Sequence, residues 1–221
     1  PSPAYVGRVS AVFDNNGMGV RGDLRAVVKA ILLDPEARGG PPADNVAGHF
    51  RDPALFVIGM LRSLDVRSAD GLSSSDGVLN AQTTNMALDV YRPPNVFSYY
   101  PADFLVPGTT DVHGPEFGTL NASTALRRAN FVNTMVFSRI NTGTDIPRGT
   151  SINLAQFNPL ASNPAALVDE LDRRLTQSSM STAMKNSIIQ AVNVVPASNA
   201  LGRVQQAVYL VCTSSQYQVQ R

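Results

Sequence analysis

The chain has 221 residues, 43% of them hydrophobic, and its 18 lysines and arginines nearly balance its 17 aspartates and glutamates. This length suffices for one large or two small domains with a buried core, and the near-neutral charge, with no cluster of Lys or Arg, argues against a dedicated nucleic-acid binder. The single cysteine excludes an internal disulfide and a cysteine-based zinc site. No apolar run approaches the ~18 residues that a membrane span needs.

Helical periodicity runs through almost the whole chain. Ser2 followed by Pro3 supplies a cap and a first-turn proline for a helix over residues 3–13. Asp23 caps a second helix over 24–32, which Asp34-Pro35 ends.

A flexible Gly/Pro-rich connector is expected at 38–42, and Asp52-Pro53 then starts a helix over 54–61. This segment is apolar on every side, which is typical of a central buried helix. A buried strand is the alternative that so short an apolar run leaves open. A Ser/Asp/Gly-rich loop over 65–77 precedes a short helix near 78–89.

Residues 90–118 are rich in proline and aromatic residues and show no steady period. A long insert of this kind in a compact domain is usually functional or packed as an irregular wrap. A long helix follows near 123–140, then a loop region over 141–164. The side chains expected to face inward from the long helix are Leu126, Ala129, Val132, Val136 and Ile140.

Three helices close the chain, near 164–176, 180–193 and 199–213. No segment shows the two-residue alternation of a half-buried strand. The predicted fold is all-α, an irregular globular bundle of about seven or eight helices in a single domain over 1–221. Cys212 lies in an apolar helix, so we expect a buried, inert thiol.

The candidate metal sites are poor. The segment 14–25 resembles a calcium loop only superficially, because Met18 and Arg25 stand where oxygen ligands are needed, so a Gly/Asn turn is the preferred interpretation. Zinc could use only His49, His113 and a carboxylate such as Glu116, in a Pro/Gly loop that would not aim them together. We expect a loop histidine hydrogen-bonded to the backbone, and neither a metal nor another cofactor.

Other motifs favour structural roles. The stretch 71–75 fails the last position of Gly-x-Ser-x-Gly, and the glycines of 17–22 follow no strand, so a serine hydrolase and a dinucleotide site are disfavoured. Asn121-Ala122-Ser123 matches a glycosylation acceptor, but a helix N-cap is preferred.

Two classes of function stay open for the aromatic loop. Asp103, Asp111 and Glu116 could supply the paired carboxylates of a hydrolase, most plausibly one acting on a polysaccharide, although the chain has no tryptophan. Alternatively, the loop binds a polysaccharide or an envelope protein through exposed aromatic side chains, since aromatics are favoured at interfaces. These aromatic binding candidates are Tyr91, Phe97, Tyr99 and Tyr100. Clustered acids in a cleft would favour the enzyme, and dispersed, solvated acids would favour binding; the sequence favours the binding module.

His49 and Arg51 are further binding candidates, just before the apolar helix. A structural role is preferred for them: Arg51 satisfies loop carbonyls and His49 caps or hydrogen-bonds nearby, because polar groups beside a buried helix need partners.

Five stretches of the sequence carry a family resemblance: residues 21–38, 49–53, 92–97, 126–131 and 208–221. Together they resemble the C-terminal part of a bacterial family known as domain of unknown function 1800. The second, His-Phe-Arg-Asp-Pro, is similar to the family's short His/Lys-Leu-Arg-Glu-Pro motif before an apolar helix, and the last resembles the family's terminal signature.

The resemblance implies no activity, and therefore no catalytic residue. It implies an exported protein, as does the low share of charged residues, 16%. It also implies a longer protein with an N-terminal portion before Pro1, which could cover an apolar face of this chain. The chain departs from the family where Ser98 to Pro101 replace a common Gly-Trp-Pro, so tyrosines would have to serve in any tryptophan-lined site.

Overall fold

The computed structural model describes residues 2–38 and 48–220, and the chain divides into two units, Pro1–Ala47 and Gly48–Arg221. The sequence, by contrast, predicts a single domain over 1–221. The connector expected at 38–42 lies, apart from Arg38, outside the described residues. In the parts of the chain that the structure describes, no helix is both long and apolar enough to cross a membrane.

The first unit is a pair of helices that pack against each other, α1 (Pro3–Asp14) and α2 (Leu24–Leu33). Both begin where the sequence predicts, because the side chains of Ser2 and Asp23 each accept a hydrogen bond from an amide of the first turn. Within this unit, neither helix buries a residue. The apolar side chains of the hairpin are therefore not enclosed by the hairpin itself.

The turn between α1 and α2 is built on asparagine side chains. Asn15 Oδ1 accepts hydrogen bonds from the amides of Gly17 and Gly19, and Asn16 Nδ2 donates to Asp23 at 2.7 Å. These bonds confirm the Gly/Asn turn predicted for the segment that resembles a calcium loop.

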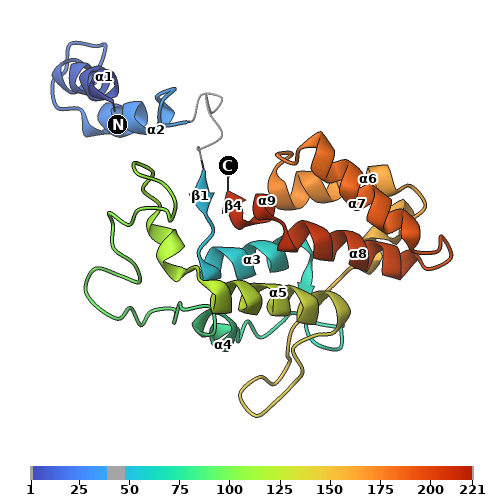
Figure 1. The fold of residues 1–221 in the computed structure, drawn as a ribbon. Coiled ribbons are helices and arrows are strands. Elements are labelled where there is room, and N and C mark those ends of the chain that lie inside the picture. The colour runs from blue at the N-terminus through green and yellow to red at the C-terminus, as the bar shows by residue number, and fades with distance from the viewer. Residues whose placement is uncertain (1, 39–47, 221) are drawn as a thin grey trace. The chain divides into compact units, whose positions relative to one another are not determined.

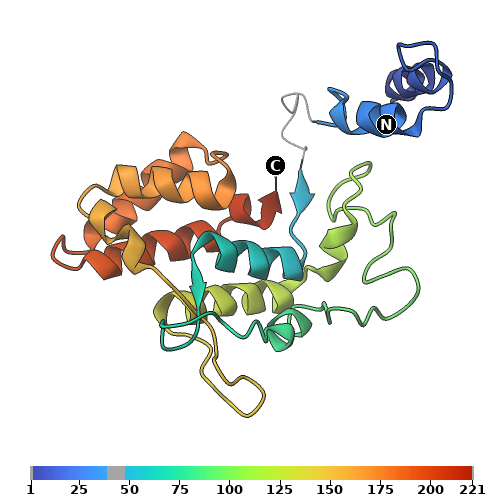
Figure 2. The same cartoon turned by 180° about the vertical axis from the view of Figure 1, so that it is seen from behind.

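The second unit is built around α8 (Ala200–Thr213), which packs against α5, α6 and α7. Helix α3 runs beside α5 in both views (Figures 1 and 2), and the rings of Phe56 and Phe131 join the two helices with 6.4 Å between their centroids. The helix predicted over 54–61 is thus confirmed, and the alternative of a buried strand is excluded. The helices named here are α3 (Pro53–Ser63), α5 (Ala122–Phe137), α6 (Pro164–Leu171) and α7 (Thr182–Val194).

The core is made of apolar side chains from these helices, as the helical periodicity predicts. Cys212 is fully buried among them, which confirms the buried thiol expected from the sequence, and burial raises the pKa of this thiol. The buried apolar residues of the three predicted closing helices include Leu167, Val168, Leu171, Leu175, Ile188, Val192, Val204, Val208 and Val211.

The predicted inner face of α5 is partly wrong. Leu126 is 61% exposed, whereas Thr124, Arg128 and Phe131 are buried. The buried face of α5 is therefore rotated relative to the predicted one: a threonine and an arginine face the core, and an apolar leucine is left in solvent. The helix starts at a capping box between Asn121 and Thr124, which confirms the N-cap interpretation of that site.

Two short antiparallel ladders were not predicted, so the fold is mostly helical rather than all-α. Strand β1 (His49–Phe50) pairs with β4 (Val219–Gln220), and β2 (Val66–Arg67) pairs with β3 (Ser151–Ile152). Strands of two residues are too short to show an alternation in the sequence. The first ladder holds the end of the described chain beside the start of α3 (Figure 1).

Several short elements also differ from the sequence prediction. Helix α4 (Asn80–Thr84) is shorter than the helix predicted near 78–89, and α6 ends in a π-helical turn, η3 (Asp172–Thr176), rather than continuing as α-helix to 176. Two 3-10 helices, η1 (Pro115–Thr119) and η2 (Ala155–Leu160), and α9 (Ser215–Gln218) lie in stretches predicted as loop or left unassigned.

Candidate functional site

Arg51 is fixed at the start of α3. Its guanidinium is buried, donates from Nη2 to the carbonyl of Leu175 at 3.0 Å, and lies 4.3 Å from the ring centroid of Tyr217. Tyr217 in turn donates from its hydroxyl to the carbonyl of Phe56 at 2.9 Å. Arg51 thus satisfies a main-chain carbonyl, as expected, although that carbonyl belongs to the π turn.

A second buried arginine, Arg128, lies in the same region and was missed in the sequence. Its Nη1 donates to the carbonyl of Arg51 and to Gln218, at 2.9 and 3.0 Å. Its Nε and Nη2 have no hydrogen-bond partner among the described residues. Burial lowers its pKa to about 10, because the charged form is penalised in a dry environment. Its position four residues after Thr124, on one helix face, is the only signal of this role in the sequence.

His49 and Glu116 come together beside β1. His49 Nδ1 lies 3.3 Å from Glu116 Oε1, and the rest of the imidazole is largely exposed. Burial, followed by the nearby carboxylates of Asp52 and Glu116, raises the pKa of the Tyr100 hydroxyl. Of the predicted site residues, the structure therefore brings His49 and Glu116 together, at the C-terminal end of the aromatic loop.

The aromatic loop (residues 90–118) is ordered by its own backbone bonds. Residues 104–114 form a hairpin-like turn, in which Val106 N donates to Val112 O and Gly114 N donates to Phe104 O. The 3-10 helix η1 anchors the loop, because the ring of Phe117 packs on Phe50 of β1 at 4.5 Å.

Tyr99 clamps the beginning of the same loop. Its hydroxyl donates to the carbonyl of Asp89 and accepts from the amide of Arg92 at 3.2 Å. Between these two residues, Tyr91 adopts a left-handed backbone with φ of 66° and is 96% exposed. A bulky residue rarely adopts this conformation, and strain of this kind gathers at functional sites.

The loop encloses a cavity of about 430 Å³. Phe97, Tyr99 and Tyr100 supply its aromatic walls, and Asn95 and Asp103 supply polar groups. Phe97 is 80% exposed, so its ring is available to a ligand. A cavity of this size, with aromatic walls and a few polar groups, is typical of small-ligand sites.

The three candidate acids are not equivalent. Asp103 and Asp111 are exposed, whereas Glu116 is half-buried and faces His49. His113 Nδ1 lies 3.1 Å from the carbonyl of Asp103, which is the loop histidine bonded to backbone that the sequence predicts. In the stretches 2–38 and 48–220, no group of three or more His, Cys, Asp or Glu side chains could hold a metal ion.

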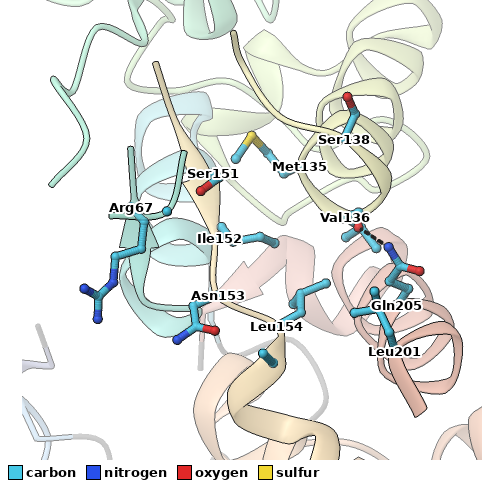
Figure 3. A pocket seen from close by; sticks show the side chains of 12 residues that line it. Arg67, Met135, Val136, Ser138, Ser151, Ile152, Asn153, Leu154, Leu201 and Gln205 are labelled. Carbon is cyan, nitrogen blue, oxygen red and sulfur yellow. Dashed lines mark hydrogen bonds between the residues drawn. The ribbon is translucent and has the colours of Figure 1, made fainter. Parts of the chain in front are cut away.

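A larger cavity, of about 520 Å³, lies between β3 and the ends of α5 and α8 (Figure 3). Arg67 is the one charged residue that lines it, and this arginine is paired with Asp65 at 2.8 Å. Gln205 is occupied as well, since its Nε2 donates to the Val136 carbonyl. Its lining residues include no acid, no general base and no unpaired cation, so we do not assign a catalytic role to this cavity.

Comparison with known proteins gives one match. A family model described as "Protein of unknown function (DUF1800)" matches residues 1–219. Neither the curated proteins nor the solved structures contain a match to the chain.

Proposed function

The chain belongs to the DUF1800 family of proteins of unknown function, and from its geometry we propose that it is a binding module whose aromatic loop holds a polysaccharide chain. The cavity between Phe97, Tyr99 and Tyr100 carries this proposal. Sugar rings present C–H faces that pack on aromatic rings and hydroxyls that need hydrogen-bond partners. The loop offers both, with Asn95 and Asp103 beside the rings.

The disposition of the acids favours binding over hydrolysis. A glycosidase needs two carboxyl groups on opposite sides of one bond, one of them with a raised pKa. Asp103 and Asp111 are exposed, and Glu116 is engaged with His49. A solvated acid beside an aromatic wall is suited to accepting hydrogen bonds from sugar hydroxyls.

The alternative is a hydrolase, and one observation favours it. A carboxylate that orients a histidine is a common arrangement for a general base, and Glu116 and His49 form such a pair with the imidazole open to solvent. Burial, followed by the carboxylates of Asp52 and Glu116, raises the pKa of the Tyr100 hydroxyl, which keeps this neighbouring group neutral.

The test is a panel of insoluble and soluble polysaccharides, with bound protein and released sugar scored separately. We expect binding without release. The variant Phe97→Ser removes one exposed ring and should weaken binding by about twofold to tenfold, given that a stacked aromatic contributes about 0.5–1.5 kcal/mol. Leu72→Ser is the matched control, because Leu72 is 85% exposed on a different loop.

Three other outcomes separate the alternatives. Sugar released by the wild type but not by Glu116→Gln or His49→Ala would establish the hydrolase. Equal binding by Phe97→Ser and by the wild type would contradict the role of the loop. Absence of any binding would point to an envelope protein as the partner, which can be sought by cross-linking at position 91.

The proposed location is outside the cytoplasm. The low share of charged residues and the many Ser, Thr, Asn and Gln side chains support it, and a polysaccharide ligand would be met there. Fractionation of cells that express the natural full-length protein tests it: recovery in the envelope or medium is expected, and recovery with cytosolic markers would contradict it.

A further inference from the structure

A third cavity, of about 350 Å³, lies between α3 and the π turn η3, and no part of the aromatic loop lines it. Arginine side chains and apolar side chains line it together. Arg51, Arg62 and Arg174 supply the charge, and Leu55, Ile58 and Leu175 supply the apolar surface. Leu55 and Ile58 are about half exposed, although they belong to the helix predicted to be buried on all sides.

The charged residues of the lining are all positive. Of its residues, all of which the structure describes, none is acidic. Arg174 is paired with Glu170 at 2.5 Å, and Glu170 is shared with Arg173. Arg51 and Arg62 have no ion pair with any acid in the described ranges 2–38 and 48–220. Arg51 and Arg62 are therefore the two lining arginines that lack an ion-pair partner among the described residues.

The guanidinium of Arg51 is held rigidly at the wall. One of its five N–H groups is used on the Leu175 carbonyl, and its plane lies near the Tyr217 ring. Gly59 lies beside it: a Cβ at position 59 would make ordinary van der Waals contact, 3.8 Å from Arg51 Nη1 and 3.4 Å from the Tyr217 hydroxyl. A preorganised cation binds an anion at a lower cost in entropy than a mobile one.

The opposite wall is a strained segment that buried polar groups hold in place. Gln177 and Ser178 both adopt left-handed backbones, with φ of 56° and 64°. Asp172, fully buried, accepts hydrogen bonds from the Thr176 hydroxyl and the Met180 amide and pairs with Lys185 at 2.7 Å. π turns and left-handed residues are unfavourable unless fixed by their surroundings, and both occur frequently at functional sites.

We infer that this cavity binds a small organic dianion: an oxyanion of charge −2 on a short apolar body, such as a phosphate monoester or a dicarboxylate. Two guanidinium groups without an ion-pair partner among the described residues match a dianion, and arginine recognises carboxylate and phosphate oxygens through paired hydrogen bonds. The volume suits a molecule of this size. Leu55 and Ile58 at the rim suit the apolar body. The inference is independent of the proposed function of the aromatic loop.

The test is isothermal titration of the purified chain with propyl phosphate, succinate, inorganic phosphate and acetate. We expect saturable binding of at least one organic dianion, about tenfold or more tighter than acetate. Propyl phosphate and succinate decide which oxyanion is preferred. Inorganic phosphate shows how much the apolar body contributes.

Three variants locate the site. Arg62→Gln should weaken binding about tenfold or more, since charge-assisted hydrogen bonds are the strong ones, and Arg62 is exposed, so the fold should tolerate the change. Arg127→Gln is the matched control: it removes the same charge from an exposed position of α5 and should change affinity less than twofold. Glu170→Gln should tighten binding several-fold, because it frees Arg174.

Failure is equally well defined. If no dianion binds saturably, or if Arg62→Gln and Arg127→Gln weaken binding equally, the inference is overturned. A matching melting temperature of the Arg62→Gln variant and the wild type excludes unfolding as the cause of a loss. Polysaccharide binding by the same samples reports on the aromatic loop alone, so failure of one proposal is distinguishable from failure of the other.

Discussion

Arg128 on α5 donates a hydrogen bond to the main-chain carbonyl of Arg51, 77 residues away, and Arg51 donates in turn to the carbonyl of Leu175. Two buried guanidinium groups thus connect α5, the start of α3 and the π turn in series. Neither has an acidic partner within ion-pair distance among the described residues. Carbonyl oxygens and aromatic faces stabilise them instead, which is a weaker compensation for buried charge.

This series predicts a measurable coupling. Arg51→Ala and Arg128→Ala should each lower the free energy of unfolding by about 2–4 kcal/mol, because each leaves a buried carbonyl without its donor and removes packing against a ring. The double variant should lose less than the sum, with an interaction of about 0.5–3 kcal/mol. Urea denaturation of the four proteins measures it. Strict additivity would contradict the coupling.

The sequence predicts the helices well because their signals are local. Caps such as Ser2, Asp23 and Asp52 and the stripe of apolar side chains in α6 and α8 need no knowledge of distant residues. The ladders β1–β4 and β2–β3 escape prediction, since each pairs two residues with two others far away in the chain.

The candidate sites likewise differ in whether their signals are local in the sequence. The aromatic loop can be predicted from its composition alone. Tyr91 and Phe97, two of its aromatic residues, are exposed in the structure. The arginine cavity cannot be predicted in this way, because Arg62 and Arg174 meet only after α3 packs on the π turn. One usable signal exists: a helix that is apolar on every side has more apolar surface than a core can cover, and Leu55 and Ile58 are the excess.

Gly149 is a position where only glycine fits. Its φ is 64°, and a Cβ there would overlap the Ile140 carbonyl and lie 2.8 Å from Ala69 Cβ. Gly149→Ala should therefore lower the free energy of unfolding by about 2–4 kcal/mol. Gly71→Ala is the control, because its φ is also positive but its Cβ would meet open space; it should lose only about 1 kcal/mol. Equal losses in thermal denaturation would show that backbone strain, not crowding, is decisive.

The ion pairs of Glu170 should make the free energy of unfolding sensitive to acid. Arg173, and then Arg174, hold the pKa of this carboxyl at about 2, against 4.5 for the free group. A carboxyl with a lowered pKa in the folded state contributes stability that is fully present above the unfolded value and is lost as pH falls from about 4.5 toward 2. The loss should be about 1–2 kcal/mol, less than the full shift implies, because the guanidinium of Arg173 is largely exposed.

The variant Glu170→Gln isolates this contribution. It should be less stable than the wild type at pH 7, and the difference should shrink as pH falls to 2.5, since the wild type loses the charge that the variant lacks. Urea denaturation at several pH values measures both curves. Asp14→Asn is the control, because Asp14 and its partner Arg21 are both exposed and the variant curve should run parallel to that of the wild type. Parallel curves for Glu170→Gln as well would contradict the prediction.

At position 91 we expect stability and ligand binding to favour different residues. Its left-handed backbone is fixed from both sides by Tyr99, which contacts Asp89 and Arg92, yet its own side chain is 96% exposed and packs on little of the fold. Tyr91→Asn should raise the free energy of unfolding by about 1 kcal/mol, because asparagine adopts this conformation more readily than a bulky residue does. The same change removes an exposed ring and should weaken polysaccharide binding.

A second variant separates the backbone effect from the loss of the ring. Tyr91→Ala removes the ring equally, but alanine tolerates a left-handed backbone less well than asparagine. Both variants should bind the ligand equally weakly, and only the asparagine variant should melt above the wild type. If neither variant changes binding, Tyr91 lies outside the binding surface. If both gain stability, the exposed ring itself is unfavourable in the free protein, and the loop holds it in solvent for a partner to cover.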